Sequence, residues 1–109
     1  MGETRVTMTV TNPANGKKFD ALFLVDTGAD HCMAPAPLLD SIELADGSTR
    51  EYDFGFAEID MLGDIAQARV IFGEPESEPL LGVIVLEDLG IVVDPLNKTL
   101  RRLPALLLK

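Results

Sequence analysis

The sequence lacks tryptophan and contains only one cysteine and one tyrosine. A single cysteine excludes an intramolecular disulfide, and so few large aromatic rings give no stacking platform for bases. Basic residues are also scarce, since nine Lys plus Arg stand against eighteen Asp plus Glu, for a formal net charge of −9. Nucleic acids and anionic membranes bind basic surfaces. We therefore expect neither as a partner.

Long hydrophobic runs are absent as well. The longest apolar stretch extends from Leu80 to Val93, and Glu87, Asp88 and two glycines interrupt it. It falls short of the roughly 18 apolar residues that a membrane-spanning helix needs. The first five residues contain no apolar segment typical of a signal peptide. These features together predict a cytoplasmic protein.

The length and composition fit one globular domain. The chain has 109 residues, of which 47% are apolar, and shows no internal repeat or low-complexity segment. We expect a single domain over residues 1–109, large enough for a modest core.

The apolar pattern predicts short strands separated by turns. Residues 5–11 alternate between apolar side chains and threonine, as in a half-buried strand. An Asn15-Gly16 turn leads to a return strand over residues 17–25. Pro35 and Pro37 are expected to end regular pairing, and Asp46-Gly47 is typical of a hairpin turn. Further strands are predicted over residues 41–44, 51–54, 56–61, 68–72, 91–93 and 99–103.

In one segment the spacing of the apolar residues changes from that of a strand to that of a helix. Residues 83–89 favour a short helix, and Gly90 occupies the position where a helix commonly ends. The sequence therefore predicts an all-β fold, a closed or partly rolled β-barrel, with one short helix near the C-terminus.

An aspartate follows the most apolar strand. Residues 22–25 are Leu-Phe-Leu-Val, and Asp26-Thr27-Gly28-Ala29-Asp30 comes directly after them. An ionised carboxylate at the end of a core strand is costly unless other groups bond it. Gly28 lets the backbone turn and brings N–H groups near the carboxylate, and Thr27 adds a hydroxyl.

The segment Asp26-Thr27-Gly28-Ala29 after an apolar strand resembles the active-site loop of retropepsin-like aspartic proteases. Leu80-Leu81-Gly82, followed by a short helix and a strand, is similar to the segment behind that loop in this family. The resemblance is greatest to its small prokaryotic members. Val83 departs from the retroviral pattern, in which an arginine that supports the loop and the dimer follows the glycine.

The resemblance implies an aspartic endopeptidase with no metal or organic cofactor. Such chemistry needs two adjacent carboxylates that share one proton, and this chain has one Asp-Thr-Gly. It therefore implies a homodimer in which both copies supply Asp26 and cleave an extended peptide. The apolar tail at residues 105–108 would lie in the dimer interface. Asp26, Thr27 and Gly28 would be the catalytic residues, and the expected substrate contacts are Ala29, Asp30, Met33, Ala45, Asp46, Gly47 and Leu81, with residues 45–47 in the flap that covers the substrate.

Several alternatives remain open at this point. The same fold can serve as a non-catalytic dimeric module that binds peptides or proteins, or as a domain excised from a polyprotein. Asp30 can contact the substrate, pair with a basic residue such as Arg5, or cap its own turn. His31 and Cys32 suggest a cysteine protease or a metal site, but neighbouring strand residues point to opposite faces and a zinc site needs more ligands.

Overall fold

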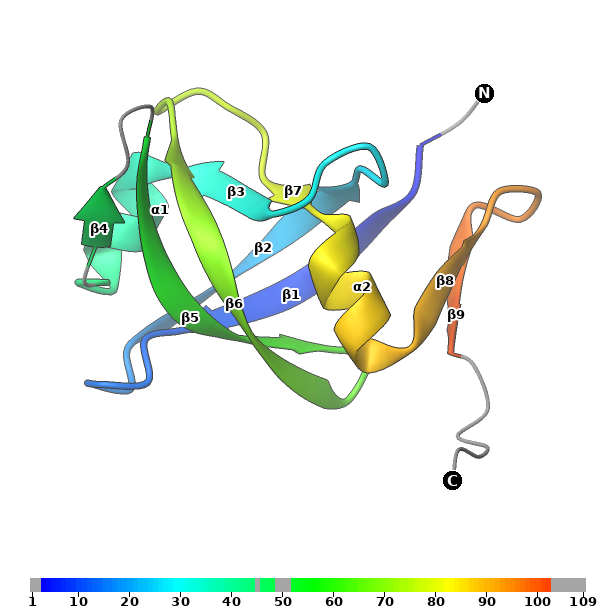
Figure 1. Ribbon diagram of the computed structural model, residues 1–109, viewed down its shortest axis with the longest axis horizontal. Coiled ribbons are helices and arrows are strands. Elements are labelled where there is room, and N and C mark those ends of the chain that lie inside the picture. The colour runs from blue at the N-terminus through cyan, green and yellow to red at the C-terminus, as the bar shows by residue number, and fades with distance from the viewer. Residues whose placement is uncertain (1–2, 45, 49–51, 103–109) are drawn as a thin grey trace.

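The computed structural model describes residues 3–44 and 52–102, together with the backbone of residues 46–48. The described part is mostly β-sheet with two short helices, α1 (Ala36–Ser41) and α2 (Val83–Leu89). Figure 1 shows their arrangement. The strands are β1 (Arg5–Thr11), β2 (Lys18–Val25), β3 (Cys32–Pro35), β4 (Asp46–Ser48), β5 (Asp53–Met61), β6 (Asp64–Gly73), β7 (Leu80–Leu81), β8 (Ile91–Asp94) and β9 (Thr99–Arg102).

Six of the described strands form a ring. The strands β1, β2, β7, β3, β6 and β5 are hydrogen-bonded in that order. β5 then pairs again with β1, with residues 58–60 opposite residues 9–11, so that the sheet closes on itself. β4 pairs with the other end of β5. The predicted closed sheet is therefore confirmed.

Inward-facing side chains fill the ring. In β1, Met8 and Val10 are buried and alternate with partly exposed threonines, as the sequence predicted. On β5 and β6 small residues face the interior, and Ala57 lies opposite Ala68. These small side chains leave room in the same core for Phe23, which is completely buried.

The prediction of a single helix is wrong, because α1 occupies Ala36–Ser41. Strand pairing does end near Pro35 and Pro37, but the chain continues as α1 to Ser41, and residues 42–43 form a turn in place of the predicted strand over residues 41–44. Proline suits the first turn of a helix, where its missing N–H has no intrahelical acceptor. The prolines therefore lie at the start of α1 as well as at the end of strand pairing.

The hairpin of β4 and β5 also differs from the prediction. Asp46 pairs with Gly55 and Gly47 with Phe54, so the Asp46-Gly47 pair lies within a strand and not at the turn. β4 ends at Ser48 and β5 begins at Asp53, and Ala45 and residues 49–51 lie outside the described residues. Of the predicted strand 51–54, Asp53 and Phe54 belong to β5, residue 52 precedes it and residue 51 lies outside the described residues. The predicted strand 56–61 is also part of β5, since Gly55 continues the pairing with Val70.

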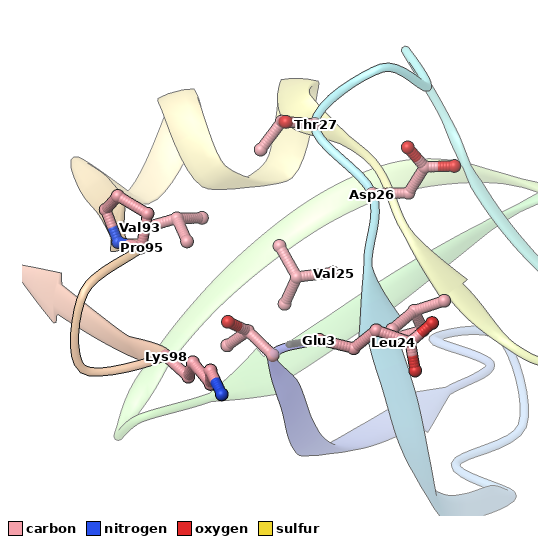
Figure 2. A pocket seen from close by; sticks show the side chains of 9 residues that line it. Glu3, Leu24, Val25, Asp26, Thr27, Val93, Pro95 and Lys98 are labelled. Atoms are coloured by element: carbon pink, nitrogen blue, oxygen red, sulfur yellow. The ribbon is translucent and has the colours of Figure 1, made fainter. Parts of the chain in front are cut away.

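β8 and β9 form a separate two-stranded sheet, which we call the β8–β9 ribbon (residues 91–102). Figure 1 shows that it extends from the end of α2 beside the ring. Ile91 is buried, and Val93 and Leu100 pack against the core. The turn of the ribbon and the residues just before β1 line a common groove, to which Lys98 and Glu3 contribute (Figure 2).

Neither described helix is long and apolar enough to cross a membrane.

The helix predicted over residues 83–89 is confirmed with those bounds. It ends at Gly90, whose φ of 67° lies in the left-handed region that glycine adopts without strain.

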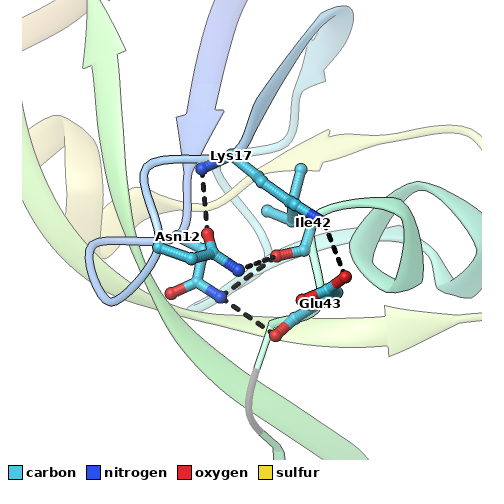
Figure 3. Close-up of polar contacts among 5 residues, drawn as sticks. Asn12, Lys17, Ile42 and Glu43 are labelled. Atoms are coloured by element: carbon cyan, nitrogen blue, oxygen red, sulfur yellow. Dashed lines mark hydrogen bonds and ion pairs between the residues drawn. The ribbon is translucent and has the colours of Figure 1, made fainter.

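A buried asparagine joins the β1–β2 hairpin to the end of α1 (Figure 3). Asn12 is 4% exposed, and its amide donates hydrogen bonds to the carbonyl oxygens of Ile42 (3.1 Å) and Glu43 (2.9 Å). Its side-chain oxygen accepts from the backbone N–H of Ala14 at 2.9 Å. Lys17 adds an exposed ion pair with Glu43 at 2.6 Å.

Replacing this asparagine should destabilise the fold measurably. Asn12→Ala removes the donor to the part-buried carbonyl of Glu43 and one of the two donors to the buried carbonyl of Ile42, which costs about 1–3 kcal/mol of unfolding free energy. Urea denaturation followed by circular dichroism at one protein concentration measures this loss. Asn15→Ala is the matched control, because Asn15 is exposed and donates one bond to Ile42 at 3.2 Å. Equal losses in the two variants would contradict the role assigned to Asn12.

Candidate active site

Asp26 lies immediately beyond the end of β2. The parallel pairing of β2 with β7 sets Val25 beside Leu81. The backbone N–H of Asp26 then donates to the carbonyl oxygen of Leu81 at 3.0 Å, and that of Val25 donates to Thr4 at 2.8 Å. Backbone bonds on both sides therefore fix the position at which the carboxylate leaves the sheet.

The loop after Asp26 is a tight turn that bonds its own aspartate. The backbone N–H of Gly28 donates to Oδ1 of Asp26 at 3.0 Å, and the N–H of Ala29 donates to the Asp26 carbonyl at 3.0 Å. Oδ2 of Asp26 has no hydrogen-bond partner among the described residues. Asp26 is partly exposed, and Thr27 and Gly28 are exposed. One carboxylate oxygen therefore orients the side chain while the other is available for a further contact.

The start of α2 supports this loop from behind. The first N–H groups of a helix have no acceptor within the helix. Here the N–H of Val83 donates to the carbonyl of Ala29 at 2.8 Å, and that of Ile84 donates to Asp30 at 3.2 Å. The loop thus receives backbone support from the helix at the position where the retroviral pattern has an arginine side chain.

Gly82 permits this close contact. A Cβ atom on Gly82 would lie 2.5 Å from the carbonyl oxygen of His31 and 2.7 Å from that of Asp30. Real Cβ atoms essentially never approach backbone atoms so closely. The Leu80-Leu81-Gly82 segment therefore lies behind the loop, and its glycine is required by the space available.

The remaining predicted site residues occupy different surroundings. Ala29 is partly exposed and Asp30 is exposed, both in the loop. Met33 lies on β3 and is partly buried beside Gly73. Leu81 is 0% exposed and belongs to the core, so its side chain lies behind the loop and not on its surface.

The flap residues lie at a distance from this loop. Figure 1 shows β4, which contains Asp46 and Gly47, beside α1 at the opposite end of the ring from the loop between β2 and β3. Within a single chain the structure therefore does not bring these two residues to Asp26.

Arg5 and Asp30 are not paired within the chain. Arg5 forms ion pairs with Glu78 at 2.8 Å and with Glu3 at 2.9 Å. The hydrogen bonds that Arg5 donates to the Glu78 carboxylate raise the pKa of Arg5, so it stays charged. This pair joins β1 to the connection before β7, where the carbonyl of Pro79 accepts from Leu24 at 2.9 Å.

Cys32 has the surroundings of a core residue. Its side chain is 1% exposed, and burial raises the pKa of the thiol, which disfavours the nucleophilic thiolate. In the part of the chain that the structure describes, no three His, Cys, Asp or Glu side chains come together as metal ligands. These findings give no support to a cysteine-protease or metal site at His31 and Cys32.

Two open hollows meet at Thr27. A groove of about 610 Å³ separates the end of β2 and the residues before β1 from the ribbon residues Val93, Pro95 and Lys98. A second hollow of about 470 Å³ lies between Thr27, α2 and the ribbon. In Figure 2 the Asp26 carboxylate points away from Val93 and Pro95. Sequence reasoning did not identify these ribbon residues, because they carry no recognisable motif.

Substituting Gly82 should destabilise the protein because a larger side chain has no space beside the Asp26 loop, and not because of the backbone conformation of Gly82. In Gly82→Ala the new Cβ meets the carbonyls of His31 and Asp30, so the loop must move. We expect a loss of about 3 kcal/mol or more of unfolding free energy, as for severe overpacking. Urea denaturation measures it. Gly90→Ala is the control, since it has open space and a φ of 67°, and should lose only about 1–2 kcal/mol. A smaller loss in Gly82→Ala than in Gly90→Ala would contradict this account.

Comparison with known proteins gives matches to solved structures. No family model and no curated protein matches the sequence. EIAV protease complexed with the inhibitor HBY-793 matches with a TM-score of 0.60 and 18% identity, over 82% of this chain and 89% of that one. A retropepsin-like aspartic protease from Rickettsia conorii matches with a TM-score of 0.56 and 19% identity, over 86% of each chain.

Both matches cover more than four fifths of this chain, with little identity in sequence. They agree with the resemblance found at Asp26-Thr27-Gly28 and at Leu80-Leu81-Gly82. The chain therefore has the fold of the retropepsin-like aspartic proteases.

Proposed function

We propose that this protein is an aspartic endopeptidase that acts as a homodimer, with Asp26 of both copies forming the catalytic pair. The observation that carries the proposal is the position of Asp26. It stands beyond the end of β2 in a glycine turn, with backbone bonds from β7 and its own loop, within a fold shared with aspartic proteases. The chain contains one such aspartate, so the second carboxylate comes from a second copy.

The chemistry needs only these two carboxylates and a water molecule. Two carboxylates a hydrogen bond apart share one proton, because both cannot be ionised at that distance. The ionised carboxylate removes a proton from the water as its oxygen attacks the peptide carbonyl carbon. The protonated carboxyl donates its proton to the carbonyl oxygen. The carboxyl that took the water proton then donates it to the amide nitrogen, while the other carboxylate takes a proton from a hydroxyl of the tetrahedral diol as the C–N bond breaks, which releases the two products.

The geometry of the Asp26 loop is suited to holding a carboxylate in these two roles. The N–H of Gly28 donates to Oδ1 of Asp26 and so fixes the orientation of the side chain. Thr27 is exposed at the meeting point of the two hollows, so its hydroxyl is available to bond the partner loop across the two-fold axis. Thr27 and Gly28 thus position the carboxylate.

The substrate would lie extended between the two copies. An extended peptide can pair with the β4–β5 hairpin as an added strand. Ala29, Asp30 and Met33 are the proposed contacts from the loop and from β3. Ala45, Asp46 and Gly47 would contribute from the flap, with Ala45 outside the described residues and Asp46 and Gly47 in β4. A cytoplasmic location stays a prediction.

The proposal is tested by cleavage of a mixed peptide library between pH 4 and pH 8, with mass spectrometry of the products. Wild type should cut, and Asp26→Asn should lose at least about 10³-fold in rate, since the base that activates water is removed. Asp40→Asn is the matched control, because Asp40 is an exposed aspartate on α1. It should keep the wild-type rate.

Equal cleavage by wild type and Asp26→Asn would contradict this assignment. Cleavage by none of the three proteins would instead favour the non-catalytic binding module, which pull-down with the same peptides would then detect.

Dimerisation should strengthen as the pH falls. Each chain has a formal net charge of −9, so two copies repel each other, and protonation of carboxylates weakens this repulsion. Formation of the aspartate pair also takes up one proton. Sedimentation velocity should therefore give a dimer Kd several-fold lower at pH 5 than at pH 8. Added salt screens the repulsion between the two net charges, so the pH dependence of the dimer Kd that remains at high salt comes from the two Asp26 carboxylates. An equal Kd at both pH values would refute this expectation.

A further inference from the structure

The β8–β9 ribbon has an inner and an outer face. Residues paired across two antiparallel strands point to the same face. Val93 pairs with Leu100 and Ile91 with Arg102, and the apolar members of this set pack on the core. The inner face therefore carries Arg102 at its end, while Val92 and Arg101 share the outer face.

Arg102 joins this end of the ribbon to the turn between β5 and β6. Its Nη2 donates to the carbonyl oxygen of Leu62 at 2.6 Å, and its Nη1 lies 3.0 Å from Oδ2 of Asp64. In the described part of the chain, Arg102 makes the polar contacts between β9 and the ring. The planar guanidinium is suited to two such contacts at once, and lysine is not.

The turn that receives Arg102 has a defined shape. Met61 pairs with Asp64, so the turn has two central residues, Leu62 and Gly63, with φ values of 51° and 81°. Left-handed values at both positions are those of a type I′ turn, which fits the twist of the strands. The Leu62 carbonyl and the Asp64 carboxylate are therefore presented at fixed positions beside the ribbon.

The opposite end of the ribbon lies beside the candidate active site. Asp94 accepts hydrogen bonds from the backbone N–H groups of Leu96 (3.0 Å) and Asn97 (3.2 Å) and from the Asn97 amide (2.9 Å). The turn is thus well bonded, and it exposes Leu96, which is 87% accessible. Pro95 and Lys98 of the same turn line the groove that also contains Asp26 and Thr27.

From this arrangement we infer that Arg102 is a positioning residue for dimerisation. Val93 and Leu100 pack the ribbon on the core, and its turn forms one wall of the groove at Thr27, so the orientation of the ribbon sets the width of that groove. The Arg102 contacts to Leu62 and Asp64 hold the other end of the ribbon and so help to fix that orientation. They thereby shape the surface that receives the second copy. This inference rests on the proposed homodimer and assigns Arg102 no contact with the reacting atoms.

Two measurements on the full chain test the role of Arg102. Arg102→Gln removes the guanidinium and with it the ion pair to Asp64 and the hydrogen bond to Leu62. Arg101→Gln is the matched control on the outer face. Sedimentation velocity should show the dimer Kd rising about tenfold in Arg102→Gln (about 1.4 kcal/mol), since two ribbons per dimer lose their link. Arg101→Gln should stay within about twofold of wild type, as expected for an exposed residue without such contacts.

Electron-spin distance measurements report the ribbon separately from the dimer. Spin labels at Leu96→Cys and Lys18→Cys, in a Cys32→Ala background and diluted with unlabelled chain, give the distance from the ribbon turn to the ring. The distribution should be narrow with Arg101→Gln and broader with Arg102→Gln. Cleavage activity lost in Arg102→Gln should return as protein concentration rises, because only association is impaired.

Three outcomes would overturn the inference. They are an unchanged distance distribution in Arg102→Gln, a broader distribution with an unchanged dimer Kd, and an activity loss that persists at saturating protein concentration. A wild type that stays monomeric at all concentrations contradicts the proposed homodimer itself, and with it this inference. The distance measurement still shows in that case whether Arg102 orients the ribbon, so the two failures are distinguishable.

Discussion

The close approach of Gly82 to the backbone of Asp30 and His31 is the constraint on which the site depends. Because Gly82 has no Cβ, the segment from β7 into α2 can lie directly against the Asp26 loop. The polar backbone groups of the two segments then satisfy each other, including the first N–H groups of α2. This mutual bonding explains how the loop is supported with Val83 in place of an arginine.

Local patterns in the sequence were sufficient where one physical rule acted alone. The alternation in β1 and the period of α2 with Gly90 gave those elements with their observed bounds. α1 was missed because proline both ends strands and begins helices, and only the tertiary fold decides which applies. Asp46-Gly47 was assigned to a turn for a similar reason, since pairing with β5 extends past it.

Part of the candidate site could likewise be predicted from local sequence patterns, and part could not. The Asp26 loop and the Leu80-Leu81-Gly82 segment were recognisable because specific side chains, or the lack of one, are needed there. The acceptors at Thr4 and Pro79 were not, since any residue supplies a backbone carbonyl. The two hollows at Thr27 also escaped prediction, because their walls come from segments far apart in the chain whose placement depends on the ribbon.

The loop is complete within one chain, although the proposed catalytic pair is not. Its bonds come from β2, β7, α2 and its own turn, and none of them needs a second copy. In the proposed dimer, association therefore brings together two preformed loops and does not have to build them. Preorganisation of this kind lowers the entropy lost on association. The open surface at Thr27 and the orientation of the ribbon then become the features that decide how tightly, and in what geometry, two copies meet.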